Sequence, residues 1–377
     1  MNEEVGVRWR VFVHALDRTG PPMLARSLMR WMVEAHPEIK IEIVAFRGGP
    51  LAEDLEGLGS VTVVLDDHEP WDAAVLDPLR AGQLRDRLAL LDPVSVNLFV
   101  SIAAAQVMPL LPTELGPIVT WVVEVGEDFH WFHAPLGLIE RTDVFLAGSE
   151  ASAVELAPLL GPSWPRTVVR EFVESPVPIS SPRRRQLRSE MGAADDQLLV
   201  IGAGIGTSRK GIDLFAEVAS LTQARSTAPI VFCWIGGSDD ALFPLVAADL
   251  GHPELARLRL LPPVDDLGSY LAAADVMVHP ARRDAFPLVC VSAAAAETPV
   301  VAFASSGGVT ELLGDDLAGG VFPETDELAS AVIDLSDRQR RNDVGEAQQR
   351  RTRSYVASAA APAFMATVER LVAELGR

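Results

Sequence analysis

The stretch that decides the fold is "LLVIGAGIGTSRKGIDLFAEVASL", residues 198–221. It opens with an apolar, β-branched run, passes through a glycine-bearing loop, and ends in "IDLFAEVASL", whose apolar residues recur at helical spacing. A strand followed by a helix requires a crossover connection, which is typical of a parallel sheet. The stretch therefore predicts an α/β fold.

The same alternation of short β-branched runs and amphipathic segments fills the chain on both sides of this stretch. The predicted strands before it are "WRVFVHAL", "KIEIVAF", "VTVVL", "VSVNLFV", "PIVTWVVEV" and "DVFLAGS". Those in the second series are "QLLVIGAG", "PIVFCWIGG", "RLRLLPP", "DVMVHPA" and "PVVAFAS". Between the series, about residues 172–192 are rich in Pro, Ser and Arg without a sustained apolar period, which indicates a linker. The two series therefore predict two doubly wound domains joined in tandem.

A length of 377 residues agrees with two domains, because a single core usually stops growing below that size. We predict an N-terminal domain over 1–175 and a C-terminal domain over 176–355. Sheets of this type bind ligands beyond the carboxyl ends of their strands, so two of them facing each other create a cleft. In the tail 356–377, Phe364, Val368, Leu371 and Val372 share one apolar helical face.

Composition narrows the classes of partner. A net charge of −20 argues against nucleic acid, which needs a basic surface, while a small anion can still bind where a few cations converge. Cys233 and Cys290 lie in apolar surroundings and indicate buried thiols in a reducing cytoplasm. We find no signal peptide and no apolar run of about 18 residues, which predicts no transmembrane segment and leaves a peripheral membrane contact open.

Lys210 is conspicuous because the chain has only one other lysine, Lys40. Arg209 and Lys210 stand where a loop meets a helix N-terminus, an arrangement suited to a diphosphate. A solvated basic turn is the alternative interpretation.

A second cluster lies in "HPARRDAFPLVCVSAAAAETPVVAFASSGGVTELLG", residues 279–314. One predicted strand runs into a basic loop that contains Asp284, and the next runs into a loop with Gly307, Gly308 and Glu311. A basic loop beside paired glycines provides the cationic neutralisation and the close backbone approach that a nucleotide requires.

Two further loops follow strands of the first series. At Gly20 the chain turns into a helix, but Pro21 and Pro22 remove two amide donors, so a purely structural turn is equally compatible. The segment "VTWVVEVGEDFHWFH" places Glu124, Asp128 and His130 in one loop, where a carboxylate could orient an acceptor group. A solvated loop is the alternative, and a metal site at His130 and His133 has too few partners to be indicated.

Together these motifs resemble the family 4 glycosyltransferases of the GT-B fold, over nearly the whole chain. "RTGPPMLARSLMRW" is similar to the "RTGAP…LLRWL" start of one subgroup, and "GTSRKGIDLFAEVA" to its "WRKGPDLF" element. "FCWIGG" is similar to its "WIGG" strand, and "RRDAFPLVCVSAAAAETPVVAF" to its "REDPFPLVVLEAAALGLPVVAF".

The resemblance implies a nucleotide-diphosphate sugar held mainly by the second domain, an acceptor on the first, and a terminal helix that returns to the first domain. Arg209 and Lys210 would meet the diphosphate, and Asp284 would offer its carboxylate to the sugar. The residues implied around the donor are Gly20, Phe286, Pro287, Leu288, Val289, Ser292, Gly307, Gly308 and Glu311. Those implied on the acceptor side are Thr19, Glu124, Asp128 and His130.

Three positions depart from the family pattern. Its pair of glutamates corresponds to Asp284 and Ser292, and a neutral serine is a weaker partner for ribose hydroxyls, at a cost of roughly 1.5–3 kcal/mol. An arginine common five residues before the lysine is Ile205 here, and a His-Glu pair is Val123-Glu124. Glu297 lies about 140° around the helix from Ser292 and is not expected to replace the missing glutamate.

The resulting expectation is a cytoplasmic, metal-independent, retaining glycosyltransferase without a cofactor, which takes a nucleotide sugar and an acceptor small molecule or glycan. The alternatives are another GT-B reaction, such as an epimerase or an atypical glycosyl coupling, and a non-catalytic nucleotide-sugar binder, because the second family glutamate is Ser292.

Overall fold

The computed structural model describes residues 6–65, 78–126, 137–237, 246, 255, 257–314 and 320–376. The chain forms two compact units. The first comprises Met1–Val173 and Ala357–Arg377, and the second comprises Glu174–Val356. Each is described below by itself.

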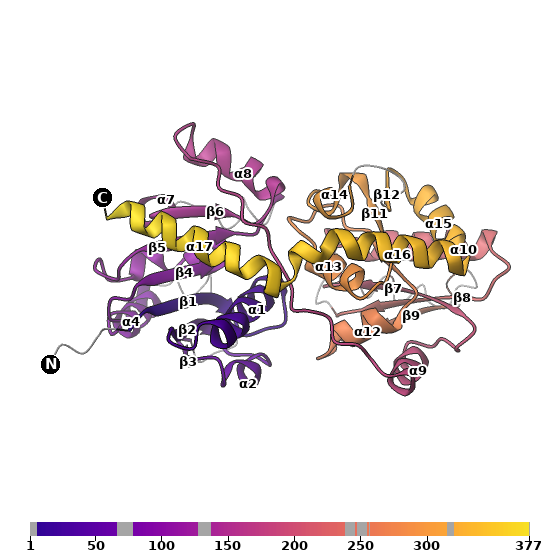
Figure 1. Cartoon of the computed structure of the whole chain (residues 1–377), viewed down its shortest axis with the longest axis horizontal. Helices are drawn as coiled ribbons and strands as arrows, with labels where there is room; N and C mark the ends of the chain where they lie inside the picture. Colours follow the sequence, from indigo (N-terminus) through magenta and orange to yellow (C-terminus); the bar gives the residue numbers. More distant parts are fainter. Residues whose placement is uncertain are drawn as a thin grey trace. The chain divides into compact units, whose positions relative to one another are not determined.

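The first unit contains a six-stranded parallel sheet with the order β3-β2-β1-β4-β5-β6 (Figure 1). Its strands are β1 (Arg8–Ala15), β2 (Lys40–Arg47), β3 (Ser60–Val63), β4 (Val96–Val100), β5 (Ile118–Val122) and β6 (Val144–Ala147). Its helices are α1 (Gly20–Ala35), α2 (Ala52–Leu55), α4 (Pro78–Leu88), α5 (Ile102–Ala105), α7 (Leu138–Arg141), α8 (Glu150–Leu160) and α17 (Ala357–Leu375), with the 3₁₀ turn η1 (Met108–Leu110). All five residues of β4 and of β5 are buried, as expected of strands covered on both faces.

Helix α17 packs beside α1 and over the sheet of the first unit (Figure 1). Phe364 of this helix is fully buried, and its ring lies 4.3 Å from the ring of Trp121 on β5. The amide of Ala357, where the helix begins, donates to the carbonyl of Val173 at 2.7 Å. Of the predicted apolar face, Phe364 and Val368 are buried, whereas Leu371 and Val372 are half-buried.

The second unit contains another six-stranded parallel sheet, ordered β12-β11-β10-β7-β8-β9. Its strands are β7 (Leu198–Ala203), β8 (Ile230–Ile235), β9 (Leu258–Leu261), β10 (Val276–His279), β11 (Val300–Phe303) and β12 (Val321–Phe322). Its helices are α9 (Ser181–Glu190), α10 (Ile212–Arg225), α12 (Leu267–Ala273), α13 (Leu288–Ala295), α14 (Val309–Leu313), α15 (Thr325–Asp334) and α16 (Arg338–Thr352), with the 3₁₀ turns η3 (Ala304–Ser306) and η5 (Arg353–Tyr355). Both sheets have the strand order 3-2-1-4-5-6 of a Rossmann fold, which confirms the predicted pair of doubly wound domains.

The sequence-based prediction is wrong in two places. The segment assigned to the linker contains α9, whose side chains are mostly polar, so it has no apolar period to detect. Its only buried residues are Leu187 and Arg188, and Ser180 caps its N-terminus by accepting from the amide of Arg183. Strand β12 was not predicted because two residues are too few to form a pattern.

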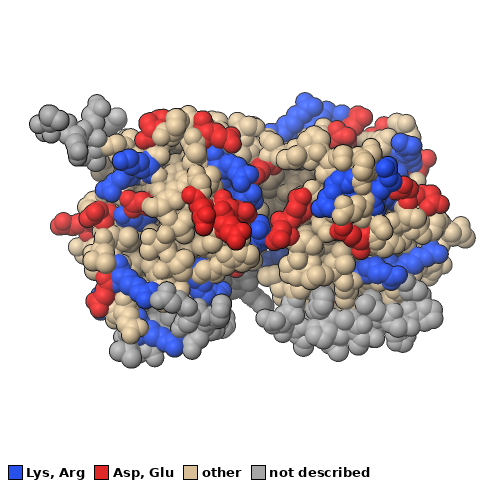
Figure 2. Space-filling model, turned by 90° about the horizontal axis from the view of Figure 1, so that it is seen from below, with Lys and Arg blue, Asp and Glu red and all other residues tan. Residues whose placement is uncertain are grey.

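The polar surface is mixed in sign. On the face shown in Figure 2, Lys and Arg side chains are interspersed with Asp and Glu side chains over both units. None of the helices in the described part of the chain is long and apolar enough to cross a membrane.

Candidate functional site

The strand order of the second unit defines where its ligand site belongs. Strands β7 and β10 are neighbours in the sheet, although they are not consecutive in the sequence, so the connections on either side of them run in opposite directions. Ligands of doubly wound sheets bind at this switch point, beyond the carboxyl ends of the strands. The loops that leave these two strands, 204–211 and 280–287, are two of those singled out in the sequence.

Backbone contacts join these loops. The amide of Arg282 donates to the carbonyl of Arg209 at 2.9 Å. The guanidinium of Arg282 donates to the carbonyl of Ser208 at 2.7 Å and forms an ion pair with Asp213, also at 2.7 Å. Gly211 has a φ of +73°, and a Cβ there would lie 2.1 Å from the carbonyl oxygen of Pro280. The lysine loop is therefore held directly against the end of β10.

Gly211→Ala is expected to destabilise the second unit, because the added Cβ meets backbone and the left-handed φ strains an alanine by about 1–3 kcal/mol. Gly268→Ala on α12 is the control, since a Cβ built at Gly268 lies 3.8 Å from its nearest neighbouring atom among the described residues, Asp266 Oδ1. Chemical denaturation should show a lower unfolding free energy for Gly211→Ala and little change for Gly268→Ala. Equal stability of the two variants would contradict the close approach of the loops.

The centre of the site is an ion pair between the two loops. Lys210 Nζ lies 2.5 Å from Asp284 Oδ2, and the side chains are 21% and 9% exposed. Burial by itself would raise the pKa of Asp284, but Lys210, His279 and Arg209 outweigh it and hold the pKa below its ordinary value. Asp284 is therefore a carboxylate near neutral pH, and Lys210 is the cation that balances it.

Arg209 lies beside this pair. Its guanidinium donates to the carbonyl of Arg283 at 3.2 Å, one residue before Asp284. The structure thus brings together Arg209, Lys210 and Asp284, the three residues predicted to carry the chemistry. Ile205 lies five residues before Lys210, where the similar glycosyltransferases commonly have an arginine. It is 47% exposed in the same loop.

A histidine that the sequence analysis did not single out completes the cluster. His279 is the last residue of β10 and is 2% exposed, with Nε2 3.5 Å from Asp284 Oδ2. Burial, reinforced by Lys210 and Arg209 and opposed by Asp284, lowers the pKa of His279 to about 4. The available signal was a polar residue that ends the apolar strand "DVMVH".

The paired glycines allow a third loop to reach the site. The amide of Asp284 donates to the carbonyl of Ser306 at 2.7 Å, and the amide of Gly308 donates to the carbonyl of Asp284 at 3.0 Å. A Cβ at Gly307 would lie 2.6 Å from the Asp284 carbonyl oxygen, and one at Gly308 only 1.8 Å from that of Ala285. Glycine at both positions is what permits this approach. Glu311 follows in the first turn of α14.

The remaining donor-side residues lie where the loop after β10 enters α13. Phe286 is buried against the ring of Tyr355, with centroids 5.2 Å apart, and Pro287 caps α13. Leu288 and Val289 are the first helical residues, whose amides have no acceptor within the helix. Ser292 is half-buried one turn further on.

Glu297 does not compensate for Ser292. Its carboxylate accepts from Gln349 of α16 at 2.9 Å, and its φ of +64° places it past the end of α13.

In the first unit, two of the predicted residues lie at the start of α1. Thr19 is its N-cap, but the Thr19 hydroxyl donates to Asp17 Oδ1 at 2.5 Å instead of accepting from the helix. Gly20 is the first helical residue, and no atom of the described residues lies within 4 Å of a Cβ built there.

Glu124 is buried at the carboxyl edge of the same sheet. It accepts from the Ser101 hydroxyl and from the amides of Ile102 and Val123, at 3.3 and 3.0 Å. These bonds hold Ser101, whose φ is +88°. Asp128 and His130 fall outside the described residues. In the part of the chain that is described, no three His, Cys, Asp or Glu side chains are grouped as metal ligands.

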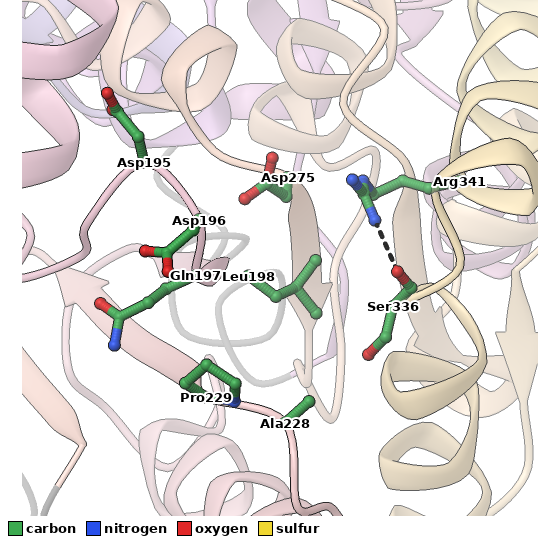
Figure 3. Close-up of a pocket in the computed structure, with 9 residues that line it drawn as sticks. All are labelled: Asp195, Asp196, Gln197, Leu198, Ala228, Pro229, Asp275, Ser336 and Arg341. Carbon is green, nitrogen blue, oxygen red and sulfur yellow. Dashed lines mark hydrogen bonds between the residues drawn. The ribbon is translucent and has the colours of Figure 1, made fainter.

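A pocket of about 190 Å³ lies at the amino ends of the strands of the second sheet, opposite the edge that bears Lys210 and Asp284 (Figure 3). Its lining includes Leu198, the first residue of β7, and Pro229, which precedes β8. The carboxylate of Asp275 in this pocket binds Arg188 at 2.7 Å, and Arg341 donates to the Ser336 carbonyl. These polar groups are occupied by the fold, and the pocket is smaller than the several hundred Å³ of a typical ligand site.

Comparisons with known proteins find similarity over part of the chain in sequence and over nearly all of it in fold. Residues 195–338, which include both loops, match the model for "Glycosyl transferases group 1". The chain is 32% identical to D-inositol 3-phosphate glycosyltransferase of Xylanimonas cellulosilytica over 211 residues. The aligned region covers 52% of this chain and 48% of that protein. A 28% identity over 126 residues, 31% of each chain, relates it to alpha-galactosylglucosyldiacylglycerol synthase of Streptococcus pneumoniae. The chain thus spans about half or less of these relatives.

Solved structures match over the whole fold. HepE of Anabaena, in complex with UDP and glucose, gives a TM-score of 0.79 at 16% identity, covering 97% of this chain and 100% of that one. Sucrose-phosphate synthase of Thermosynechococcus elongatus gives 0.78 at 16% identity, covering 98% and 100%. The predicted GT-B fold is confirmed.

Proposed function

We propose that this chain is a retaining family 4 glycosyltransferase of the "WRKGPDLF" subgroup, which moves a sugar from a nucleotide diphosphate to an acceptor. The observation that carries the proposal is the Lys210–Asp284 ion pair at the switch point of the second sheet. One cation and one carboxylate, both partly buried, can address a diphosphate and a sugar hydroxyl at the same place. The structures of HepE are complexes with UDP, glucose and UDP-glucose, which makes uridine nucleotides the first donors to test.

In this proposal Arg209 and Lys210 stabilise the negative charge that grows on the diphosphate as it leaves, which is electrostatic stabilisation of the transition state. Asp284 accepts hydrogen bonds from the sugar, and the first backbone amides of α13 donate hydrogen bonds to phosphate oxygens. The acceptor atom forms its bond to the anomeric carbon on the face from which the diphosphate leaves, and the leaving phosphate oxygen takes the acceptor proton there, so the configuration is retained. Two cations then serve in place of a metal ion, and the reaction needs no cofactor.

On the acceptor side, Thr19 and Gly20 at the start of α1 and Glu124 after β5 remain part of the proposal. Since Glu124 already accepts several hydrogen bonds within its own unit, we propose that it holds the Ser101 turn in place beside the acceptor. A cytoplasmic location agrees with the two buried thiols, Cys233 and Cys290.

Calorimetry with UDP, GDP and ADP, followed by assays of nucleotide release from the matching sugar donors, tests the proposal. Binding with slow hydrolysis or transfer is expected. Absence of binding by all three would overturn the donor assignment. Binding without turnover of any matched donor would favour the alternative, a nucleotide-sugar binder, to which the neutral Ser292 points.

Ser292→Glu is expected to tighten nucleoside diphosphate binding about tenfold or more, because a carboxylate makes charged hydrogen bonds to ribose hydroxyls where serine makes neutral ones. Inorganic pyrophosphate, which lacks a ribose, should bind no more tightly to this variant than to the natural protein. Ser292→Gln is the matched control of equal length without charge, and it should gain less. Unchanged or weaker binding of nucleoside diphosphates by Ser292→Glu would show that the site is arranged around serine.

A further inference from the structure

Two side-chain nitrogens face the same carboxylate oxygen at the centre of the site. Lys210 Nζ lies 2.5 Å from Asp284 Oδ2, and His279 Nε2 lies 3.5 Å from that oxygen. The lysine is bonded to Asp284, whereas His279 Nε2 is buried and makes no hydrogen bond within the described structure. Asp284 Oδ2 thus accepts a hydrogen bond from Lys210, while His279 Nε2 lies slightly beyond hydrogen-bond distance.

A buried polar atom without a partner is uncommon, because it loses its hydrogen bonds to water and gains nothing in return. His279 is 2% exposed, so bulk solvent does not reach Nε2. The ring carries a single N–H in its neutral form, and a carboxylate facing Nε2 favours the tautomer with the proton on that nitrogen. The ring therefore presents an unused donor to Asp284.

The proposed function sets up a conflict at Lys210. The Lys210 ammonium has three N–H donors, but the one that binds Asp284 at 2.5 Å cannot also bind a phosphate, so turning fully toward a diphosphate breaks the bond to Asp284. The Asp284 side chain is only 9% exposed, and a buried carboxylate that loses its cation is strongly destabilised. A second donor at Asp284 would lower this barrier to the release of the lysine.

We propose that His279 is a positioning residue that donates its Nε2 proton to Asp284 when Lys210 turns toward the diphosphate of the donor. The inference rests on the proposed function. Closing the His279–Asp284 distance from 3.5 Å to that of an ordinary hydrogen bond takes only a few tenths of an ångström. Asp284 then remains charged and correctly oriented for the sugar, while the full charge of Lys210 is available to the phosphate.

Calorimetry with inorganic pyrophosphate and with UDP, GDP and ADP tests the inference on three forms of the protein. His279→Leu removes the donor at similar size and is expected to weaken binding about tenfold or more, the range for a hydrogen bond to a charged group. His279→Gln places an amide N–H near the position of Nε2, and it should bind within about threefold of the natural protein.

A double-mutant cycle separates this role from a structural one. In an Asp284→Asn background no buried charge needs compensation, so adding His279→Leu should change pyrophosphate affinity by less than about twofold. The same loss in both backgrounds, or equal losses for His279→Leu and His279→Gln, would overturn the inference. So would a lower melting temperature for His279→Leu with unchanged affinity below that temperature.

A measurement on the natural protein does not depend on the leucine variant folding. In ¹⁵N NMR of the imidazole rings, with His279→Gln used for assignment, pyrophosphate should shift the Nε2 signal of His279 as its proton enters a hydrogen bond. An unshifted signal in protein saturated with pyrophosphate would overturn the inference alone. Failure of the natural protein to bind pyrophosphate or any of the nucleoside diphosphates would overturn the proposed function, and this inference with it.

Discussion

Lys210→Met is expected to weaken binding of pyrophosphate and nucleoside diphosphates by at least about a hundredfold, and to remove transfer activity with it. Methionine keeps an unbranched apolar stem, one heavy atom shorter than the lysine side chain, and has no charge. The loss includes a charge-assisted hydrogen bond to phosphate and the electrostatic stabilisation of the leaving group. Arg209 remains nearby, but its guanidinium is already bonded to the Arg283 carbonyl.

The same substitution changes how stability depends on pH. In the natural protein the pKa of Asp284 is lower than its ordinary value of 3.8, so its contribution to stability is present above that pH and is lost as pH falls further. Without Lys210 the effect of burial dominates and the pKa of Asp284 rises. The unfolding free energy of Lys210→Met should therefore be lowest relative to the natural protein near pH 7, and the difference should shrink toward pH 4.

Lys40→Met is a matched control, because Lys40 is the only other lysine and is exposed at the start of β2. It should bind pyrophosphate normally and change stability by less than about 0.5 kcal/mol. Two lysines also make amine labelling easy to interpret: pyrophosphate should protect Lys210 and not Lys40 in a mass-spectrometric assay. Equal affinity of the two methionine variants for pyrophosphate would refute the role assigned to Lys210.

Arg188→Ala is expected to have the largest effect on stability. This arginine of α9 is 1% exposed and lies 2.7 Å from Asp275. It also donates to the carbonyls of Ala273, Ala194 and Gln197. Removing one partner of a buried ion pair costs about 3–5 kcal/mol. Asp275 also lies 2.9 Å from the partly exposed Arg184, which compensates part of its charge, so we expect a loss near the lower end of this range.

The position of Arg188 links this loss to the site. Asp275 immediately precedes β10, and its carboxylate accepts from the amide of Leu199 in β7 at 2.8 Å. The pair thus ties together, at their amino ends, the two strands whose carboxyl ends present Lys210 and Asp284. Diphosphate binding should fall together with stability.

Arg185→Ala, on the same helix but exposed, is the control and should change stability by less than about 0.5 kcal/mol. Thermal and urea unfolding followed by circular dichroism would measure both variants, with a decrease of roughly 2–4 °C in melting temperature expected per kcal/mol. An Arg188→Ala protein as stable as Arg185→Ala would show that the buried pair contributes nothing.

Much of the fold was predictable because buried parallel strands are written as continuous apolar runs. Strands such as "PIVFCWIGG" and "PIVTWVVEV" are buried along their length, and the sequence therefore marks them clearly. Helix α9 was missed for the converse reason. It is anchored by Arg188, a charged residue that a search for apolar periodicity assigns to solvent.

The candidate site was predictable in part. Glycines at positions 211, 307 and 308, basic residues and a carboxylate after predicted strands indicated which loops bear the chemistry. His279 was not found, since a histidine at the end of an apolar strand has no local pattern that distinguishes a core residue from a site residue.

The sequence by itself determined the alternation of strands and helices, the division into two Rossmann-like halves and the loops that carry charge, because these depend on local spacing and burial. Only the tertiary structure decided that Lys210 binds Asp284 and that His279 faces the same carboxylate oxygen. It also decided that Arg188, through Asp275, joins the amino ends of β7 and β10. His279 is close to Asp284 in the sequence, whereas the contacts of Lys210 and Arg188 join residues about 70 to 90 positions apart in the chain. Strand order brings them together, and a strand order is a property of long-range pairing that no local pattern contains.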